Sequence, residues 1–586
     1  MVSVLTYLED LENLLGRKLP RDRDKLNEIL YSVKCEVANS EFGNQNTKDH
    51  SQEETELQIE NVDTNRPDTW SAEGIARALR GILEIETGLK KYKTSTKIAT
   101  EITVDKELRE IRPYIACTVA YHAKISDSIL RGLVQLQEKL DLSYGRRRKR
   151  SSIGFYDFDL ITPPLRYGIE DPDKIRFVPL DGNEALSLRE ILHQHPKGIE
   201  YGQILEDHQR LPILMDSKQK VLSFPPIINS NDLGKLTPDT RNILVEVTGT
   251  NETTVLNCLT ILATTLADRG AQLRSARIHY KYAKTRATVT PRLDERTIKL
   301  PIEQTKKLIG VDLTKQQIIS LLKRSRYDVR HSDTRTLTVA IPCYRLDILH
   351  PNDVIEDVAI AYGLNRIEPR WPIDLTVGNI SELEKYSDKF RELAIGFGFQ
   401  EVLTFMMTNE EKIFTKMQQP PVEYVRISNP KVQTLTCLRP WLLPSLLEFL
   451  SNNTHVQYPQ KLFEVGDCTA WDESSQPKDD RKLCCVSAHA RANFTEMKSI
   501  LQTLLANLGF DFAIQSTNNA SYLDGRAATI SVNKREVGMI GEVHPRVIRN
   551  WNLENPVVAM ELNISTLLTL HGVRAAPQLP TSERAN

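Results

Sequence analysis

The sequence lacks the features that mark proteins of membranes and of oxidising compartments. It has no run of about 18 consecutive apolar residues, the length that crosses a bilayer, and its first residues do not combine a charged start with a long apolar stretch. Its eight cysteines include no CxxC pair, the spacing typical of zinc and redox sites. We therefore expect a cytoplasmic protein that has reduced, mostly buried thiols and does not enter a membrane.

An excess of charge of one sign is also missing. The 76 basic and 77 acidic side chains give a formal net charge of -1, so no global field would draw the protein onto nucleic acid or membrane. Any contact with RNA is therefore expected to be local. Glycine and proline are not in excess either, and 586 residues are too many for one hydrophobic core. This length predicts roughly three to five domains.

Apolar periodicity predicts a mixture of helices and strands. Apolar positions at helical spacing follow Asp68, which can cap a helix, and the polar segment before it, residues 36–58, is expected to be a loop. The segments PILMD and KVLSF predict a hairpin, and residues 243–250 predict a further strand. Thr314 has the spacing of a capping box before another helix. These patterns are typical of a multidomain α+β protein.

Four carboxylates stand within eleven residues, and the last two begin a predicted helix: Asp347, Asp353, Glu356 and Asp357. Oxygen ligands of this kind suit magnesium, which needs only a few carboxylates because it keeps several waters. Asp353 and Glu356 also have the spacing of a capping box, and acidic groups at a helix N-terminus are favourable without any metal. The residues alone leave the metal site and the helix cap both open.

The run that contains these carboxylates, YRLDILHPNDVIEDVAIAYGLNRI, resembles the magnesium-binding motif of the β subunit of phenylalanyl-tRNA synthetases. The resemblance implies that the same four residues, Asp347, Asp353, Glu356 and Asp357, are magnesium ligands. The chain departs from the family at the last of them, where glutamate is common and Asp357 is shorter by one methylene. The segment DTNRPDTWSAEGIARAL, residues 63–79, resembles the first domain of the same subunit.

Two further segments resemble the editing domain of this β subunit in its archaeal and eukaryotic cytosolic form: GRRRKRSSIGFYDFDLI, residues 145–161, and PPIINSNDLGKLTPDTRNILVEVTGT, residues 225–250. In the family this domain hydrolyses tyrosine that is wrongly esterified to phenylalanine tRNA. A buried hydrogen-bond acceptor can detect the extra hydroxyl, because phenylalanine would leave that acceptor unpaired. We expect the acceptor to be Glu246, although a strand glutamate that faces solvent or forms a salt bridge is the alternative.

The rest of this pocket is predicted from neighbouring residues. Asn229, Ser230 and Thr248 are expected to orient the ester or the attacking water, and Leu222 to form an apolar wall around the ring. Because no Ser-His-Asp or Cys-His arrangement stands out, a positioned water is favoured over a protein nucleophile. The nearby basic run is either a solvated loop or an RNA contact, made by Arg146, Arg147 and Arg148.

Residues 380–570 resemble the class II synthetase fold, an antiparallel sheet with flanking helices, through LRPWLLPSLLEFLSNN and KLFEVGDC. A working site of that class needs an FRxE-like motif and a later glycine-rich segment that ends in arginine. Arg439 lies where the first motif would be but is followed by PWL, and GRAAT at Gly525 lacks the additional glycines of the second. We therefore expect a domain without the catalytic motifs.

The resemblance implies a small N-terminal domain over 1–95, a mixed α/β editing domain over 96–283, a magnesium-binding, winged-helix-like domain over 284–372, the inactive domain over 380–570 and a disordered tail over 571–586. It implies an α2β2 tetramer in which the α subunit binds ATP and attaches phenylalanine to its tRNA. Two alternatives stay open. The chain is either a tRNA-binding or assembly scaffold that has lost editing, or a free-standing aminoacyl-tRNA hydrolase.

Overall fold

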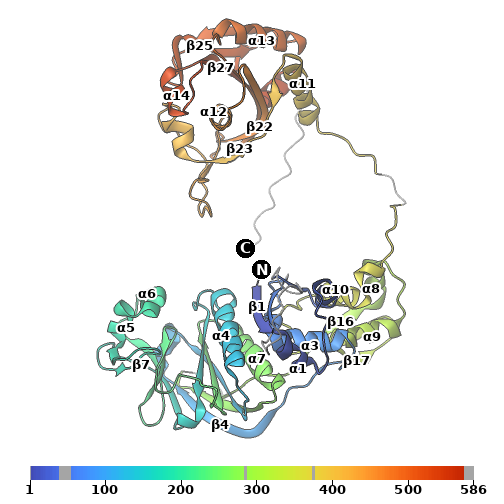
Figure 1. The fold of residues 1–586 in the computed structure, drawn as a ribbon, viewed down its shortest axis with the longest axis vertical. Helices are drawn as coiled ribbons and strands as arrows, with labels where there is room; N and C mark the ends of the chain where they lie inside the picture. The colour runs from blue at the N-terminus through green and yellow to red at the C-terminus, as the bar shows by residue number, and fades with distance from the viewer. Residues whose placement is uncertain (1, 39–54, 62, 283–286, 373–375, 573–586) are drawn as a thin grey trace, which may run out of the picture. The chain divides into compact units, whose positions relative to one another are not determined.

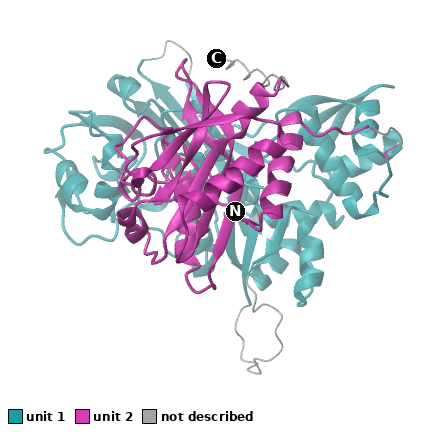
Figure 2. Ribbon diagram, turned by 90° about the horizontal axis from the view of Figure 1, so that it is seen from above, with its two compact units in different colours: residues 1–371 teal, residues 372–586 magenta. Residues whose placement is uncertain are grey.

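The computed structural model describes residues 2–38, 55–61, 63–282, 287–372 and 376–572, which form two compact units, Met1–Trp371 and Pro372–Asn586 (Figure 1 and Figure 2). The predicted class, several domains that mix helices and strands, is confirmed at this level. The finer division into four domains, including a winged-helix-like one, stays a prediction. Most of the expected loop and nearly all of the expected disordered tail lie outside the described residues.

The N-terminal part of the first unit is a three-stranded antiparallel sheet, in the order β1-β3-β2, packed against helices. Its elements are β1 (Val2–Tyr7), α1 (Leu8–Leu15), α2 (Arg23–Tyr31), β2 (Cys35–Val37), β3 (Glu56–Asn61) and α3 (Ala72–Ile82). Ser71 caps α3 by accepting a hydrogen bond from the Gly74 backbone at 3.3 Å. The prediction that Asp68 is the cap is wrong, because its carboxylate instead binds Arg66 at 2.8 Å.

The largest sheet of this unit follows, in the order β12-β11-β10-β7-β4-β14-β5-β13-β6 with β15 beside β14. Its strands are β4 (Thr94–Val104), β5 (Tyr114–Tyr121), β6 (Ser151–Asp157), β7 (Leu165–Glu170), β10 (Leu211–Met215), β11 (Val221–Phe224), β12 (Ile228–Asn229), β13 (Ile243–Gly249), β14 (Gln272–Tyr280) and β15 (Thr288–Thr290). The predicted hairpin and the predicted strand are confirmed as β10-β11 and β13. The two ends of the strand order meet, because Asn229 of β12 donates to the Phe155 carbonyl of β6 at 3.3 Å.

Helices and side-chain clusters cover both faces of this sheet. The helical elements are α4 (Asp127–Lys139), α5 (Leu188–Gln194), α6 (Pro196–Tyr201) and α7 (Glu252–Asp268), and a short pair of strands, β8 (Arg176–Phe177) and β9 (Leu186–Ser187), lies among them. Helix α7 packs on β5 and β13 through one apolar cluster, and a second cluster fills the other face. All seven residues of β13 are therefore buried, which makes its single charged residue, Glu246, unusual.

The last part of the first unit is a three-stranded antiparallel sheet, in the order β16-β18-β17. Its elements are β16 (Arg296–Pro301), α8 (Ile302–Ile309), α9 (Lys315–Arg324), β17 (Asp328–Ser332), β18 (Thr336–Ile341) and α10 (Pro351–Tyr362). The predicted capping box of Thr314 and Gln317 at the start of α9 is confirmed. Helix α10 is capped by His350, whose backbone N–H is accepted by Asp353.

The second unit is a seven-stranded sheet, in the order β19-β22-β23-β27-β26-β25-β24, with helices packed on its faces. The strands are antiparallel except for β19 beside β22. The elements are α11 (Glu382–Gly396), β19 (Gln400–Glu401), β20 (Met407–Thr408), β21 (Cys437–Leu438), α12 (Leu443–Asn452), β22 (Gln460–Trp471), β23 (Pro477–Ala488), α13 (Phe494–Asn507), β24 (Phe512–Ser516), β25 (Tyr522–Val532), β26 (Arg535–Val543), α14 (Pro545–Asn550), β27 (Val557–Asn563) and α15 (Ile564–Leu570).

Arg439 of this unit is buried and donates to Glu464 at 2.7 Å and to the Asp467 carbonyl at 3.1 Å. Its guanidinium therefore has a structural role inside the fold, as expected for a domain without the catalytic motifs. None of the helices in the described parts of the chain combines the length and the apolar character needed to cross a membrane.

Candidate functional site

A cavity of about 790 Å³ borders β6 and the segment that joins β11 to β12. Strand alternation and the meeting of the two sheet ends bring apolar and polar side chains to its wall. The side chains on its wall include Ser152, Phe155, Ser223, Phe224, Asn229 and Glu246. A concave, mostly apolar site with a few convergent polar groups is the usual form of a ligand pocket.

Glu246 is the buried charge of this cavity, with 2% of its surface exposed. Its Oε2 accepts a hydrogen bond from the Tyr156 hydroxyl at 2.8 Å, and its Oε1 has no hydrogen-bond partner among the described residues. Burial raises the pKa of Glu246 to about 7, against the opposing effects of Tyr156 and Arg112. The solvent-facing and salt-bridged alternatives are excluded, because the side chain is buried and forms no ion pair with a described residue.

The other four predicted pocket residues divide into one on the cavity wall and three away from it. Asn229 lines the cavity beside Glu246. Leu222 points into the core on the opposite face of β11, and its neighbour Ser223 faces the cavity instead. Ser230 accepts a hydrogen bond from the Leu233 backbone at 3.3 Å, and Thr248 accepts one from Arg112 at 3.0 Å. Leu222, Ser230 and Thr248 are not among the residues that line this cavity, and their roles in the pocket stay predictions.

Sequence reasoning missed Arg112, a fully buried arginine under the cavity. It donates to the Ser152 hydroxyl at 3.0 Å, to the Thr248 carbonyl at 2.7 Å and to the Arg148 carbonyl at 3.1 Å. Burial lowers the pKa of Arg112. No sequence pattern marks it, because it lies more than a hundred residues from the strand that it supports. Tyr156 and Ser223 were missed too, although Ser223 stands next to Leu222 and Tyr156 lies in the segment 145–161 that carries the resemblance.

The basic run forms a tight turn at the rim of the cavity. Arg146, Arg147 and Arg148 have φ angles of 51°, 52° and 63°, a left-handed conformation that costs roughly 1–2 kcal/mol per residue outside glycine. Arg146 and Arg147 are exposed, whereas Arg148 turns inward to donate to the Ile227 carbonyl at 2.8 Å and to form an ion pair with Asp141 at 3.2 Å. Only two of the three predicted RNA contacts are therefore free to meet a phosphate.

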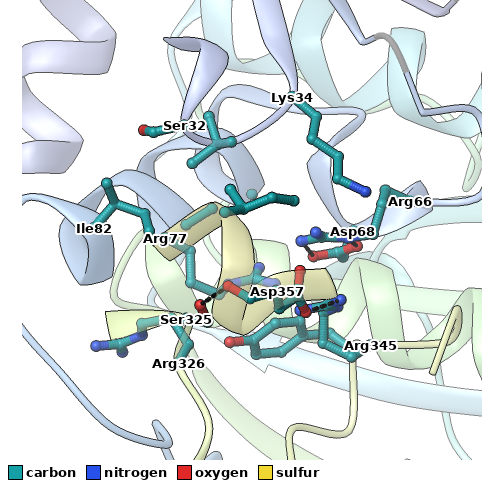
Figure 3. Close-up of a pocket in the computed structure, with 15 residues that line it drawn as sticks. Ser32, Lys34, Arg66, Asp68, Arg77, Ile82, Ser325, Arg326, Arg345 and Asp357 are labelled. Carbon is teal, nitrogen blue, oxygen red and sulfur yellow. Dashed lines mark hydrogen bonds and ion pairs between the residues drawn. The ribbon is translucent and has the colours of Figure 1, made fainter. Parts of the chain in front are cut away.

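Three of the four acidic residues of the predicted magnesium site bind cationic side chains of the chain itself. Figure 3 labels one of them, Asp357, together with Arg345. Asp347 and Asp357 both bind the guanidinium of Arg345, at 2.7 and 2.6 Å. Burial alone would raise the pKa of Asp347, but Arg345 outweighs burial and holds it at about 2. Glu356 binds Lys34, which comes from the N-terminal part of the chain, at 2.7 Å.

Asp353 is used differently from the other three acids. Its Oδ2 accepts the backbone N–H groups of Leu349 and His350, both at 2.7 Å. The predicted capping box of Asp353 with Glu356 and the predicted helix start at Glu356 and Asp357 are wrong, because α10 begins at Pro351 and its capping box pairs His350 with Asp353. Among the described residues no group of three or more His, Cys, Asp or Glu side chains is arranged to hold a metal ion. The four acids do not fit a magnesium ion together in this arrangement, and the magnesium prediction rests on the resemblance alone.

Comparison with known proteins decides the family. Residues 298–364 match the family model of the tRNA synthetase B5 domain, and residues 367–564 match that of the phenylalanyl tRNA synthetase beta chain CLM domain. The phenylalanine-tRNA ligase beta subunit of Pyrococcus horikoshii is 41% identical over 560 residues, which cover 95% of this chain and 98% of that one. The chain belongs to the phenylalanine-tRNA ligase beta subunit family.

Other members of this beta-subunit family give the same result. The beta subunit of Thermococcus sibiricus is 40% identical over 557 residues, covering 94% of this chain and 96% of that one. A crystal structure of an N-terminal fragment of the Pyrococcus horikoshii beta subunit matches with a TM-score of 0.57 and 36% identity, covering 62% of this chain and 99% of the fragment. The resemblance found in the sequence is confirmed, and the chain is a subunit of an aminoacyl-tRNA ligase.

Proposed function

We propose that this beta subunit hydrolyses tyrosine that has been wrongly attached to phenylalanine tRNA, in the cavity beside Glu246. The observation that carries the proposal is the unpartnered Oε1 of a fully buried glutamate on the cavity wall. A tyrosine hydroxyl donates to this oxygen, whereas phenylalanine leaves it unpaired at a cost of about 1–3 kcal/mol. The pocket therefore binds the wrong amino acid better than the right one.

The chemistry needs only a water molecule. The water oxygen forms a bond to the ester carbonyl carbon, the bond from that carbon to the ribose oxygen breaks, and the ribose oxygen takes up a proton. Tyrosine and uncharged tRNA leave. His195 lines the cavity, but no hydrogen bond joins it to a serine among the described residues, which argues against a serine nucleophile. Asn229 is the polar side chain best placed to orient the ester.

The exposed arginines of the rim turn, Arg146 and Arg147, are proposed to bind phosphates near the 3′ end of the tRNA. Arg148 is not a contact in this proposal, because it is used to hold the turn against the segment between β11 and β12. Clustered arginines supply the salt-dependent part of RNA affinity, and their position at the rim aligns the ester with the cavity. This contact stays local, in agreement with the net charge of -1.

The partner of this subunit is proposed to be the α chain, which binds ATP with magnesium and charges the tRNA in an α2β2 assembly. An extended segment of the second unit supports a protein contact of this kind. Leu403, Phe405 and Met407 alternate along it and are 81%, 79% and 43% exposed, whereas Thr404 and Met406 between them are half-buried. A stripe of large apolar side chains without a cover in the described chain is typical of a subunit interface.

The test uses the purified complex with its α chain and phenylalanine tRNA that carries tyrosine or phenylalanine. We expect Glu246→Ala to lower the ratio of tyrosine release to phenylalanine release by about 10- to 100-fold, because it removes one hydrogen bond to a charged acceptor. Glu138→Gln is the matched control, since Glu138 lines the same cavity but is exposed, and its ratio should stay within about twofold of wild type. Charging by the α chain should not change in either variant.

Two results would contradict the proposal. If Glu246→Ala keeps the full preference for tyrosine, Glu246 does not recognise the hydroxyl. If the complete complex releases no tyrosine, the chain is instead a tRNA-binding or assembly scaffold that has lost editing. Tyrosine release by the chain without its α partner would favour a free-standing hydrolase.

A further inference from the structure

Tyr156 donates a short hydrogen bond directly to Glu246 at this wall of the cavity. It stands on β6, the strand next to β13, and its side chain is fully buried. Its hydroxyl lies 2.8 Å from Glu246 Oε2 and 2.8 Å from the Ser223 hydroxyl on β11. The same hydroxyl therefore joins the two ends of the strand order at the floor of the cavity.

A phenol has one hydrogen to donate, so the Tyr156 hydroxyl donates to one of Ser223, Asn229 and Glu246 at a time, and a carboxylate is the strongest acceptor of the three. When Tyr156 donates to Glu246 Oε2, the Ser223 hydroxyl donates to the Tyr156 oxygen. Oε2 is then occupied, and Oε1 is the carboxylate oxygen left without a partner among the described residues. Tyr156 thus decides which oxygen of Glu246 is free and fixes the rotation of the carboxylate.

Gly154 leaves the space that the Tyr156 hydroxyl and the Glu246 carboxylate occupy. It lies opposite Glu246 in the register of β6 and β13. A Cβ atom at position 154 would lie 2.2 Å from the Tyr156 hydroxyl oxygen and 2.7 Å from Glu246 Oε2, closer than real contacts allow. A glycine in a strand costs stability because it adds backbone entropy to the unfolded chain, so its use here needs a steric reason of this kind.

We propose that Tyr156 is a positioning residue for amino-acid selection, which turns the free oxygen of Glu246 toward the substrate hydroxyl in the space that Gly154 leaves open. The inference rests on the proposed editing function and adds to it the residue that sets specificity. Tyr156 does not touch the substrate in this proposal, and it acts only through the carboxylate. Its removal therefore lowers the discrimination between tyrosine and phenylalanine more than it lowers ester hydrolysis itself.

The test compares tyrosine and phenylalanine release by the whole complex for three variants. Tyr156→Phe should lower the tyrosine-to-phenylalanine ratio about tenfold, the equivalent of one hydrogen bond, with phenylalanine release unchanged. Tyr167→Phe is the matched control: Tyr167 is equally buried in the same core cluster, but its hydroxyl donates to the Arg112 carbonyl. Its ratio should not change. Gly154→Ala displaces the same pair from the other side and should also lower the ratio, so it carries the test if Tyr156→Phe unfolds at the assay temperature.

The pH dependence of the ratio separates positioning from mere packing. The carboxylate is a stronger acceptor than the acid, so the ratio should rise as pH passes through the pKa of Glu246, about 7. Loss of the Tyr156 donor raises that pKa, so the rise should move to higher pH in Tyr156→Phe. The titratable and charged groups that face Glu246 from the packed elements are Tyr156, Tyr167, Cys117, Arg112 and Asp141.

Of these groups, Asp141 also has a pKa raised by burial to about 7. Glu246→Gln distinguishes the two carboxyls, because a flat ratio in that variant assigns the rise to Glu246 and a rise that persists assigns it to Asp141. The inference is overturned if Tyr156→Phe keeps both the wild-type ratio and its pH dependence while Glu246→Ala loses the ratio. Failure of the proposed function looks different, because the wild-type complex itself would then release no tyrosine.

Discussion

Two buried carboxylates in this chain show that a single neighbouring donor can determine the pKa of a buried acid. Asp347 and Glu246 are both desolvated, but Asp347 binds the Arg345 guanidinium and has a pKa of about 2, whereas Glu246 has a phenol as its nearest donor and a pKa of about 7. The first is a permanent anion that stabilises the fold. Glu246 changes between the carboxylate and the carboxylic acid near neutral pH. Perturbed pKa values of this kind are common at sites that bind a substrate.

The same contacts lead to a prediction about magnesium. Because Asp347 and Asp357 already bind the Arg345 guanidinium, we expect magnesium chloride to shift the thermal midpoint of the wild-type chain no more than sodium chloride of equal ionic strength. Arg345→Met leaves two buried anions face to face and should cost about 3–5 kcal/mol of unfolding free energy, part of which magnesium restores. Thermal melts with magnesium, with sodium and with a chelator measure both effects.

A different result of the same melts would contradict this prediction. A stabilisation of the wild-type chain that is specific to magnesium and absent from Asp347→Asn would establish the metal site that the resemblance implies. The guanidinium would then have to move away from the two carboxylates when the ion binds.

For single residues, the sequence predicted which residue type matters better than it predicted which face of a strand that side chain lies on. Glu246 was recognisable as the one acid in an apolar strand, and the structure buries it at the cavity. Leu222 was chosen where its neighbour Ser223 faces the cavity, because a shift of one residue along a strand reverses the face. Which face of β11 meets a cavity depends on β6, a strand far away in the sequence, so local pattern cannot supply it.

Among the elements, the rim turn between the π-helix η3 (Leu140–Tyr144) and β6 combines three consecutive positive-φ residues. Three consecutive arginines adopt the left-handed conformation that glycine adopts at no cost. Hydrogen bonds from Arg112 to the Arg148 carbonyl and from Arg148 to the Pro226 and Ile227 carbonyls hold it in place. Such strain is retained where the surrounding structure fixes it, often at a binding site.

Relief of this strain gives a prediction at the same scale. Arg147→Gly should raise the unfolding free energy by about 1 kcal/mol, because glycine removes the left-handed penalty at an exposed position. Arg147→Ala is the matched control, since it loses the same charge but keeps the penalty. Denaturant melts compare the two variants.

Binding measurements complete this prediction. Both variants at position 147 should weaken tRNA binding equally and reduce the salt dependence of binding by about one phosphate contact. Equal stability of the glycine and alanine variants would show that the turn is not strained. Unchanged salt dependence would remove Arg147 from the RNA contact.

Element prediction from the sequence succeeded where short-range signals agree. The β10-β11 hairpin and the capping box at α9 follow from alternation and from a three-residue spacing. The cap of α3 was assigned to Asp68 instead of Ser71, because both residue types cap helices and only the fold brings Arg66 beside Asp68. The magnesium motif has the same ambiguity, since Asp353 is a helix-cap residue in the structure.

Across the whole molecule, the proposed editing cavity and the proposed partner surface lie in different compact units. The cavity with Glu246 belongs to the first unit, and the exposed apolar stripe of Leu403, Phe405 and Met407 belongs to the second. Arg439 of the second unit forms a buried ion pair with Glu464. This division fits a subunit that edits through one unit and associates with its partner through the other.

The prediction for the whole molecule concerns this stripe. The double variant Leu403→Ser and Phe405→Ser should weaken association with the α chain by at least about 100-fold, because two large apolar side chains at an interface each contribute about 1.5–3 kcal/mol. Its melting temperature as a free chain should not fall, since both side chains are exposed. Sedimentation and gel filtration with the α chain measure the association.

Val432→Ser is the control for this variant, because Val432 is also apolar and 50% exposed in the same unit but lies outside the stripe. It should leave association unchanged. Full association of the double variant would show that the α chain binds elsewhere.

The burial of the cysteines has a practical consequence for following the motion of tRNA on this subunit. None of the eight cysteines, all of which lie in the described residues, forms a disulfide, and seven of them are buried. Burial raises the pKa of the half-buried Cys343 to about 11, so few thiolates exist at neutral pH. A maleimide dye would thus react with a cysteine introduced at an exposed position while the native ones stay intact. Fluorescence from single complexes can then time the arrival of a mischarged tRNA in the wild-type background.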